Sequence, residues 1–450
     1  MASKQIVIVG AGFASAALVT HLLRIGTDPK DLIVIGNGLL GAGNAYGCLN
    51  SIFRLNVRED LPIIFSDDPL HFSQWAKENL DDPEAKTNSG YFYRRQDFAS
   101  YMNSLVRKYD PTSEVQQVFA KVTQIIDRNG EWELTLDTQK TFFAKNLVLA
   151  TGNAPPHWPC EIDVNPATSA TVIQNSLVEN PWTGNWIQDL NPTEEIILLG
   201  GGLTALDAIN VLATLDHKGD IRLISPRSAI PPQQACWSRS HQPPWPSSLT
   251  PAGLVRFMRN YLPDNPPSSP EWQCAWEEMR PQLNTIWQSF SSLQRTTLLK
   301  RLGWLWSLYR FRASPQTIHS WNKLTLNEQI HTEIARAQKI ELLDGKVIIH
   351  LNNGKKVTGD RLINCTGVGK DLLSKSLIAQ GIALPDALGQ SIAVNPDFQV
   401  LRSPTSAWDS FFMIGPGTMG SLGDVVAASS IAAQAEKLSK HLTANTFSSQ

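Results

Sequence analysis

Two glycine-rich turns contain the residues whose types and spacing could do chemistry. The first lies in residues 6–17 (IVIVGAGFASAA), where Gly10, Gly12 and Ser15 follow a short β-branched run. This is the spacing of a dinucleotide fingerprint. The first glycine permits a tight turn, the second lets a pyrophosphate approach the backbone, and a small third residue lets the helix lie close to the strand. The turn therefore predicts a phosphate site at a helix N-terminus.

A second copy of this turn strengthens the interpretation. Residues 195–199 (EIILL) are another apolar run, followed by Gly200, Gly202 and Ala205 and by the helical stretch 203–215. One glycine-rich turn between a strand and a helix can be purely structural. Two of them with their strands and helices in place, about 190 residues apart, favour two nucleotide sites.

The elements that must position these turns recur in the same order. After each turn the chain has alternating strands with Asn-Gly or Asp-Gly turns, in residues 115–151 and again in residues 340–367. The two stretches close on ATG and CTG, which are residues 150–152 and 365–367. The sequence therefore predicts two units of one plan.

Composition and charge favour a globular protein that binds small molecules. The chain has 450 residues, of which 42% are hydrophobic and 18% charged, so it can form two or three domains with large cores. Its net charge of -2 gives no electrostatic reason to expect a nucleic acid or an anionic membrane as partner.

The cysteines and the first strand bear on location. All five cysteines stand singly, with no CxxC pair and no metal-ligand spacing, so we expect reduced thiols and no metal site. The first strand begins at residue 5, which leaves no room for a signal peptide ahead of it, and no run of eighteen apolar residues occurs. We therefore expect a cytoplasmic protein.

The adenosine end of the first site departs from the usual pattern. The second strand of the nucleotide fold, residues 31–35, ends at Gly36-Asn37 instead of at an acidic residue, so Asn37 must replace the ribose-binding carboxylate. A second glycine-rich loop, residues 41–47, and the segment LNVRED from Leu55 follow. Such a loop can be mobile surface, but its small side chains could also let the backbone approach a flat cofactor.

The second turn carries a clue to its nucleotide. The strand after its helix, residues 221–224, ends in Ser225-Pro226-Arg227. An acidic residue is expected there for NAD, whereas an arginine can pair with a 2′-phosphate. The sequence favours NADPH, and the alternative is that Arg227 is a solvated surface charge.

A proline- and tryptophan-rich stretch interrupts the second nucleotide unit. Eight of the chain's 14 tryptophans lie in residues 237–321, and residues 271–311 are helical in period. An aromatic lid over a cofactor is one interpretation, but an aromatic stripe is more often a local core, which we favour.

Catalytic residues are weakly marked. Asn56, His157 and His241 are the candidates, although a lone histidine is more often structural or merely exposed. The sequence contains no recognisable Ser-His-Asp arrangement. This suits an enzyme whose cofactor carries the chemistry.

These motifs together resemble the two-dinucleotide-binding-domain flavoproteins. The resemblance rests on the paired turns, ATG and CTG, the segments GAGNAYG and LNV, and the C-terminal FFMIGPGTMGSL. Within these flavoproteins the chain is most similar to the FAD/NAD(P)-binding branch that includes bacterial urate hydroxylase and aspartate N-monooxygenase. The LATG segment that begins at Leu149, with His157 five residues beyond Gly152, also resembles the sequence of N-hydroxylating monooxygenases. The FxGxxxHxxxW fingerprint of the Baeyer-Villiger class is absent.

The resemblance implies FAD on the first turn and NADPH on the second. The isoalloxazine is expected near residues 415–422, before a last helix over 424–442. The residues expected to contact the cofactors are Gly10, Gly12, Phe13, Ala14, Ser15, Asn37, Asn44, Ala45, Tyr46, Asn56, Val57, Val122, Ala150, Thr151, Gly152, Gly200, Gly202, Leu203, Thr204, Ser225, Arg227, Thr366, Gly367, Gly415 and Leu422.

The expected architecture is α/β, with two Rossmann-like dinucleotide-binding domains, for FAD and NADPH, and a helical Trp/Pro-rich insertion. The FAD domain is expected over residues 1–160 and 365–450. The NADPH domain is expected over residues 190–364, interrupted by the insertion at 228–320.

The function that follows is a single-component FAD- and NADPH-dependent monooxygenase. It would use oxygen, through a flavin hydroperoxide, to hydroxylate a small molecule at nitrogen or on an electron-rich ring. One alternative is a flavoprotein disulfide reductase, which needs a cysteine pair that this sequence does not show. The other is a flavin redox sensor without turnover.

Overall fold

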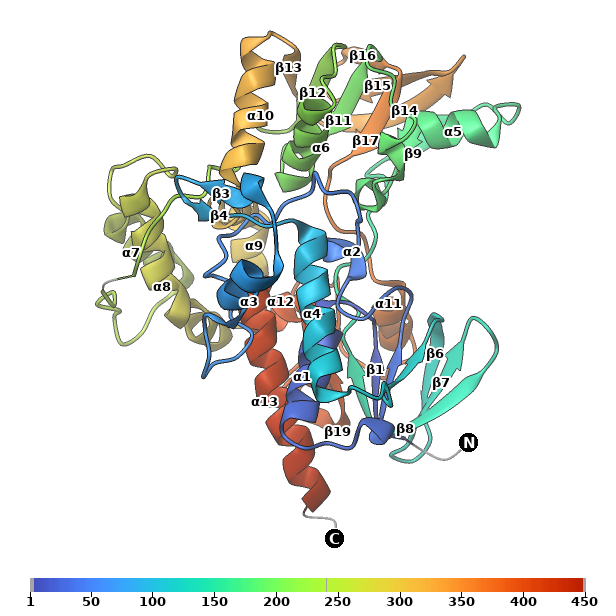
Figure 1. The fold of residues 1–450 in the computed structure, drawn as a ribbon, viewed down its shortest axis with the longest axis vertical. Helices are drawn as coiled ribbons and strands as arrows, with labels where there is room; N and C mark the ends of the chain where they lie inside the picture. Colours follow the sequence, from blue (N-terminus) through green and yellow to red (C-terminus); the bar gives the residue numbers. More distant parts are fainter. Residues whose placement is uncertain (1–3, 240, 448–450) are drawn as a thin grey trace.

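The chain is built on a mixed sheet with a parallel centre and a second, parallel sheet, each with a glycine-rich turn after one of its inner strands (Figure 1). The computed structural model describes residues 4–239 and 241–447. Both turns lie between a buried strand and a buried helix, as the apolar runs beside them predict. The expected α/β class with two nucleotide-type sheets is confirmed.

The first sheet is completed by strands from distant parts of the chain. Its order is β18-β19-β8-β1-β2-β5, and β7 joins β6 to β8. Parallel pairing aligns Val9 with Ile35 and Leu149, so β1, β2 and β8 end at one edge. Its strands are β1 (Lys4–Val9), β2 (Leu32–Ile35), β5 (Gln116–Val118), β6 (Val122–Asp127), β7 (Trp132–Leu136), β8 (Thr141–Leu149), β18 (Gln399–Ser403) and β19 (Ser406–Met413).

Helix α1 (Phe13–Arg24) lies in the interior of this unit. It packs against α4 (Arg95–Tyr109) and α13 (Ala428–Phe447), and Figure 1 shows the three helices beside the first sheet. Its residues 13–23 are all buried. A helix that is apolar around its circumference needs such cover, which explains the sequence FASAALVTHLL.

The second sheet repeats the parallel arrangement in the order β10-β17-β11-β12-β13. Helices α6 (Leu203–Thr214) and α10 (Pro315–Leu326) pack together beside it. A third sheet has the order β16-β15-β14-β9. The strands of the second and third sheets are β9 (Glu161–Val164), β10 (Leu177–Val178), β11 (Ile196–Leu199), β12 (Ile221–Ser225), β13 (Ile330–Ile334), β14 (Ala337–Leu343), β15 (Lys346–Leu351), β16 (Lys356–Gly359) and β17 (Arg361–Asn364).

Three helices form most of the Trp/Pro-rich stretch: α7 (Pro251–Tyr261), α8 (Pro270–Ser289) and α9 (Ser292–Arg310). Figure 1 shows α7 and α8 standing out to one side of the molecule. Prolines occupy the first position of α7 and α8, each after a Ser or Thr whose side chain caps the helix. Some prolines of this stretch therefore lie at the first position of a helix, where the N–H that proline lacks would have no hydrogen-bond partner within the helix.

Several tryptophans of this stretch pack with one another and with neighbouring Phe and Tyr rings. Trp272 and Trp276 are stacked with ring centroids 5.2 Å apart, and Trp276 contacts Trp306 at 5.1 Å. Trp272 and Trp276 are buried, whereas Trp304 is 43% exposed. Most of the aromatic surplus is thus a local core, as favoured from the sequence, and Trp304 is an exception.

The remaining elements are short. They are α2 (Gly43–Tyr46), α3 (His71–Asn79), α5 (Ala170–Ser176), α11 (Leu372–Ala379), α12 (Met419–Leu422), β3 (Lys86–Thr87), β4 (Gly90–Tyr91), and the 3-10 helices η1 (Pro29–Asp31), η2 (Pro83–Ala85), η3 (Pro181–Thr183), η4 (Asn185–Ile187) and η5 (Pro416–Thr418).

Two negative findings concern the described residues only. No helix among them is long and apolar enough to cross a membrane. No group of three or more His, Cys, Asp and Glu side chains among them could hold a metal ion. The expected domain bounds stay predictions, and their outermost residues, 1–3 and 448–450, lie outside the described part of the chain.

The backbone at Gly10 generates a stability prediction. Gly10 has φ +118°, and a Cβ there would lie 2.3 Å from the carbonyl oxygen of Ala150. Gly10→Ala should therefore lower the free energy of unfolding by about 3 kcal/mol or more, because strain and a backbone clash add. Gly26 is the matched control, since it has φ +94° with nothing within 4 Å. Gly26→Ala should cost only about 1–2 kcal/mol. Equal losses in urea unfolding would contradict this account.

Candidate nucleotide and flavin sites

The two glycine-rich turns have almost the same geometry. Gly10 has φ +118° and Gly200 has φ +113°. The Gly10 amide donates to the carbonyl of Ile35 at 2.7 Å, and the Gly200 amide donates to the carbonyl of Ile224 at 2.8 Å. Each turn is thus tied to the neighbouring strand that follows its own helix. The two turns, which have the same glycine spacing in the sequence, therefore also have the same backbone structure.

The closing segments ATG and CTG lie directly under the two turns. The amides of Ala150 and Cys365 each donate to the last residue of the central strand at 2.8 Å. A Cβ on Gly200 would lie 2.4 Å from the Cys365 carbonyl oxygen, as one on Gly10 would from that of Ala150. This close backbone approach explains why the first glycine is required in both turns.

The second glycine of each turn begins a helix that has no side-chain cap. Gly12 precedes α1 and Gly202 precedes α6, and neither helix has a capping side chain. A Cβ on Gly202 would meet nothing within 4 Å. Uncapped N–H groups and the positive end of the helix dipole form a binding site for an anion such as a phosphate.

The loop of residues 41–47 packs onto the first turn. A Cβ on Gly43 would lie 2.9 Å from the Cα of Gly12, so the two loops touch through bare backbone. The Asn44 side chain donates to the carbonyl of Asn153 at 3.0 Å, which joins this loop to the ATG segment. Glycine at position 43 thus permits the approach expected for a cofactor-binding loop.

Tyr46 anchors that loop to the protein. Its ring contacts Phe13 and Phe98, with centroids 6.0 and 4.9 Å away. Burial raises the pKa of Tyr46 to about 12, so the hydroxyl stays neutral at physiological pH. Tyr46 is therefore a packing residue of the candidate flavin site.

The C-terminal segment reaches the same edge of the sheet. Gly415 has φ +91°, and a Cβ there would lie 3.5 Å from the Cβ of Ala14. Its amide donates to Gln434 of α13 at 2.7 Å, and Leu422 is buried at the end of α12. Residues far apart in the sequence thus surround the N-terminus of α1.

The residues of these two edges fit dinucleotides. Gly152 and Gly367, which end ATG and CTG, have no atom within 4 Å of a Cβ position, so backbone is open to a ligand. The Thr151 hydroxyl and the Asn364 amide nitrogen are buried without a partner among the described residues. Bare backbone and unsatisfied polar atoms suit ligands rich in hydrogen-bonding groups.

The structure brings most of the expected residues to these edges. At the first sheet they are Gly10, Gly12, Phe13, Ala14, Ser15, Asn37, Asn44, Ala45, Tyr46, Ala150, Thr151, Gly152 and Gly415. At the second sheet they are Gly200, Gly202, Leu203, Thr204, Ser225, Arg227, Thr366 and Gly367. Val122 begins β6 and is buried, and Asn56 and Val57 are half-buried.

The segment of Asn56 and Val57 contacts the Trp/Pro-rich stretch through Arg58. The Arg58 guanidinium donates to the carbonyls of Ala235 and Trp237 at 3.2 and 3.0 Å. Asn56 and Val57 therefore lie where the first unit meets the insertion. The sequence gives no sign of this contact, because Arg58 is one charge in a charged run.

The two candidate histidines lie on exposed segments. His157 follows the ATG segment and packs beside Gly369, which follows CTG. The backbone amide of His241 donates to Glu278 at 2.9 Å, and both residues line a pocket of about 330 Å³. That pocket contains Glu278, Pro281 and Gln282 of α8. Asn284 of α8 instead contacts residues 421–424, which are expected beside the isoalloxazine and are called the flavin-side segment below.

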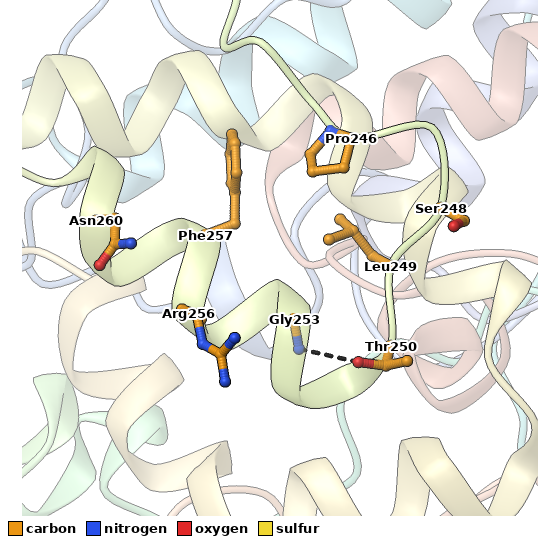
Figure 2. Close-up of a pocket in the computed structure, with 8 residues that line it drawn as sticks. All are labelled: Pro246, Ser248, Leu249, Thr250, Gly253, Arg256, Phe257 and Asn260. Carbon is orange, nitrogen blue, oxygen red and sulfur yellow. Dashed lines mark hydrogen bonds between the residues drawn. The ribbon is translucent and has the colours of Figure 1, made fainter.

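A larger cavity of about 520 Å³ lies over α7 (Figure 2). Figure 2 shows Leu249, Pro246 and Phe257 beside it, and the Gly253 amide donating to Thr250. None of its lining residues belongs to either glycine-rich turn. The cavity is therefore separate from the candidate cofactor sites.

A buried cluster of charged side chains, which sequence reasoning missed, ties α8 and α9 to the segment before α13. Asp424 Oδ2 accepts from the Nε atoms of Arg280 and Arg310, both at 2.8 Å. Glu277 accepts from Arg280 at 2.6 Å and from Arg312 at 2.7 Å. The only local signal in the sequence is the i,i+3 spacing of Glu277 and Arg280.

Further contacts hold the same segment. The Asp424 amide donates to Asn284 at 2.8 Å, and Arg295 donates to the carbonyl of Ser421 at 3.0 Å. A Cβ on Gly423 would meet Asn284 at 2.8 Å and Trp287 at 3.2 Å. Residues 421–424 are thus enclosed by α8 and α9. The insertion is fixed to the segment expected beside the isoalloxazine.

Another residue missed from the sequence lies at the end of the first site where adenosine is expected. Phe119 directly follows β5 and is 64% exposed. The Gly36 amide donates to the carbonyl of the preceding Val118 at 3.0 Å, so Phe119 is next to the turn that holds Asn37. A bulky apolar side chain directly after a strand at this edge is the signal that could have found it.

The charged cluster generates a prediction with a pH dependence. Burial by itself would raise the pKa of Glu277, but Arg280 and Arg312 outweigh it and hold the pKa at about 2. Stability from this ionised carboxylate is therefore complete above about pH 4.5 and is lost as the pH falls toward about 2. Over this pH range the free energy of unfolding of the wild type should fall by about 3 kcal/mol more than that of Glu277→Gln.

At neutral pH, Glu277→Gln should lower the free energy of unfolding by about 3–5 kcal/mol, because it leaves buried arginines without a counter-charge. Glu271→Gln is the control, since Glu271 is exposed on the first turn of the same helix. It should cost less than about 1 kcal/mol. Urea unfolding between pH 2.5 and 7 measures both, and parallel pH profiles for wild type and Glu277→Gln would refute the assignment.

Comparisons with known proteins agree with this geometry. Residues 7–154 match the family described as FAD-NAD(P)-binding. No curated protein matches the chain. Among solved structures, ornithine N-hydroxylase of Kutzneria sp. 744 is similar over 99% of this chain and 100% of its own, with a TM-score of 0.64 and 13% identity.

Two further solved structures have the same fold. L-lysine 6-monooxygenase from Pseudomonas syringae covers 98% of this chain and 99% of its own, with a TM-score of 0.64 and 15% identity. Thioredoxin reductase from Lactococcus lactis is similar over 99% of this chain and 100% of its own, with a TM-score of 0.56 and 10% identity. Together with the two turns, these comparisons show that the chain has the fold of the FAD- and NAD(P)-binding oxidoreductases.

Proposed function

We propose that this protein is an FAD- and NADPH-dependent monooxygenase that hydroxylates a small molecule at nitrogen. The observation that carries the proposal is the pair of equivalent nucleotide turns, in a chain that resembles N-hydroxylating enzymes over nearly its whole length. The Kutzneria ornithine N-hydroxylase structure is described with reduced FAD, NADP+ and L-ornithine. A single chain with two such turns can hold the same two cofactors.

The first sheet would hold FAD. Its pyrophosphate would lie at Gly12 and the uncapped N-terminus of α1, and its ring system would lie near Gly415. Bound there, the flavin would supply hydride acceptance from NADPH and activation of oxygen, so that one oxygen atom would enter the substrate and the other would leave as water. The protein supplies position, polarity and exclusion of water.

The second sheet would hold NADPH. The N-terminus of α6 after Gly202 would receive the pyrophosphate, and Arg227 would pair with the 2′-phosphate. The corresponding domain assignment is residues 1–160 and 365–450 for FAD, 190–364 for NADPH, and 228–320 for the insertion.

The insertion would form the substrate side of the site. The contacts of α8 and α9 with residues 421–424 support this, because they fix the insertion beside the flavin-side segment. Its interior also holds hydrogen-bond donors without acceptors among the described residues, at the indoles of Trp276 and Trp287 and at Arg312 Nε and Nη2. Such donors suit a ligand with acceptor oxygens, so amino acids with a free carboxylate are the first substrates to test.

A reductase is the second candidate, because thioredoxin reductase from Lactococcus lactis shares the fold. The thiols argue against it. The structure describes all five cysteines and shows no disulfide between them, and Cys365, which lies under the second turn, is buried with a raised pKa caused by burial. A buried neutral thiol is a poor nucleophile, and no second cysteine pairs with it. The monooxygenase is therefore the favoured function, and we place it in the branch that includes urate hydroxylase and aspartate N-monooxygenase, which its sequence motifs resemble.

The first functional prediction concerns FAD. Purified wild-type protein should be yellow and contain one FAD per chain. Gly12→Val should release the flavin, because its side chain would occupy the space of the pyrophosphate and crowd Gly43. Absorbance at about 450 nm after gel filtration measures retention of the cofactor. A colourless wild-type protein that does not bind added FAD would refute the proposed function.

The second functional prediction concerns substrate and oxygen. NADPH consumption should rise with one member of a panel of amino acids, diamines and heteroaromatic compounds, and an N-hydroxylated product should form in proportion. Mass spectrometry with 18O2 should place one labelled oxygen in that product. Trp287→Leu should reduce the product formed per NADPH and increase hydrogen peroxide, because Trp287 packs on Gly423 and helps to exclude water.

Two outcomes would contradict the monooxygenase. If NADPH is consumed with a disulfide compound and not with any amine, the protein is a reductase. If FAD binds but no compound of the panel raises NADPH consumption and no label from 18O2 enters a product, the protein is a flavin sensor.

A further inference from the structure

Arg227 and Trp304 form a contact between the second nucleotide unit and the insertion. The guanidinium carbon of Arg227 lies 3.8 Å from the centroid of the Trp304 ring, which is a close cation–π geometry. Trp304 is on α9, whereas Arg227 follows β12. Although Trp304 is 43% exposed, its ring covers one face of this arginine.

Helix α9 is anchored at both ends to the flavin-side segment. Arg295, near its start, donates to the carbonyl of Ser421 at 3.0 Å, and Arg310, at its end, pairs with Asp424 at 2.8 Å. Trp304 is therefore carried on a helix whose position is set by contacts to residues 421–424. It is a fixed surface against which Arg227 rests.

Arg227 is left with unused hydrogen-bonding capacity. Its Nε is buried without an acceptor among the described residues, and no described carboxylate pairs with it. Its backbone amide lies 3.4 Å from the Ser225 hydroxyl, next to Gly201 of the second turn. A half-buried guanidinium with no counter-charge is suited to an anionic ligand.

We propose that Trp304 is a specificity-determining residue for the reductant: it holds the Arg227 guanidinium flat, so that the edge of Arg227 can receive the 2′-phosphate of NADPH. This inference rests on the proposed function. A free arginine side chain loses rotamer freedom when it is fixed, and this loss opposes binding. The stack with Trp304 imposes most of this order before the nucleotide binds, which increases affinity.

The selectivity follows from the missing charge on NADH. A nucleotide without the 2′-phosphate makes little use of the ordered guanidinium edge, so Trp304 should strengthen binding of 2′-phosphorylated nucleotides and have little effect on others. A merely structural tryptophan would affect both classes of nucleotide alike. This difference separates positioning from packing.

The test measures binding and needs no turnover. Calorimetry with FAD-loaded protein compares adenosine 2′,5′-bisphosphate with adenosine 5′-monophosphate, which differ by the 2′-phosphate alone. Trp304→Leu should weaken the bisphosphate about 2- to 30-fold, the range expected for a cation–π contact, and leave the monophosphate unchanged. Trp304→Phe should retain most of the affinity, because the aromatic face remains.

Two controls make the result specific. Trp306→Leu removes a tryptophan two residues away that packs on Trp276, and should leave the ratio of the two affinities unchanged. In an Arg227→Ala background, Trp304→Leu should have no further effect, because the double-mutant cycle isolates the contact between them.

Two outcomes would overturn the inference, and they are distinguishable. If wild type prefers the bisphosphate but Trp304→Leu retains the full preference, Trp304 has no positioning role while the NADPH assignment stands. If wild type has no preference for the bisphosphate, the NADPH assignment fails and the role of Trp304 fails with it.

Discussion

The structure depends on the close approach of two backbones beneath each glycine-rich turn. Gly10 lies against the carbonyl of Ala150, and Gly200 lies against that of Cys365, at distances that exclude any Cβ. This contact aligns the end of the central strand, the start of the helix and the closing segment at one edge of the sheet. A phosphate site needs all three, because bare backbone, uncapped amides and the helix dipole act together.

What could be predicted from the sequence is what is encoded locally. The glycine spacing, the apolar strands beside it and the ATG and CTG segments each determine structure within a few residues, so the two turns and the α/β class were predictable. The residues from distant segments could be assigned to the same site only through a resemblance. Gly415 reaches Ala14 because β19 pairs with β8, which is a pairing between residues more than 200 positions apart.

The charged cluster shows why the rest was not predictable. Asp424, Arg280 and Arg310 come from three segments, and each alone is an ordinary charged residue in the sequence. Only their burial together makes them a unit, because the desolvated charges must then be paired. The insertion had a related ambiguity: its tryptophans indicated either a core or a lid. In the structure Trp276 belongs to a core, whereas Trp304 reaches out to Arg227.

The pairing of early and late segments has a consequence for how this chain acquires its structure. Strand β8 pairs on one side with β1 and on the other with β19, and α13 packs on α1. During synthesis the first sheet therefore stays incomplete, with α1 partly uncovered, until residues beyond 413 have emerged from the ribosome. Contacts of such long sequence separation slow folding and prolong exposure of apolar surface. The first unit should thus be unable to complete its fold until the second unit and the last part of the chain have been made. Until then it should need protection from aggregation.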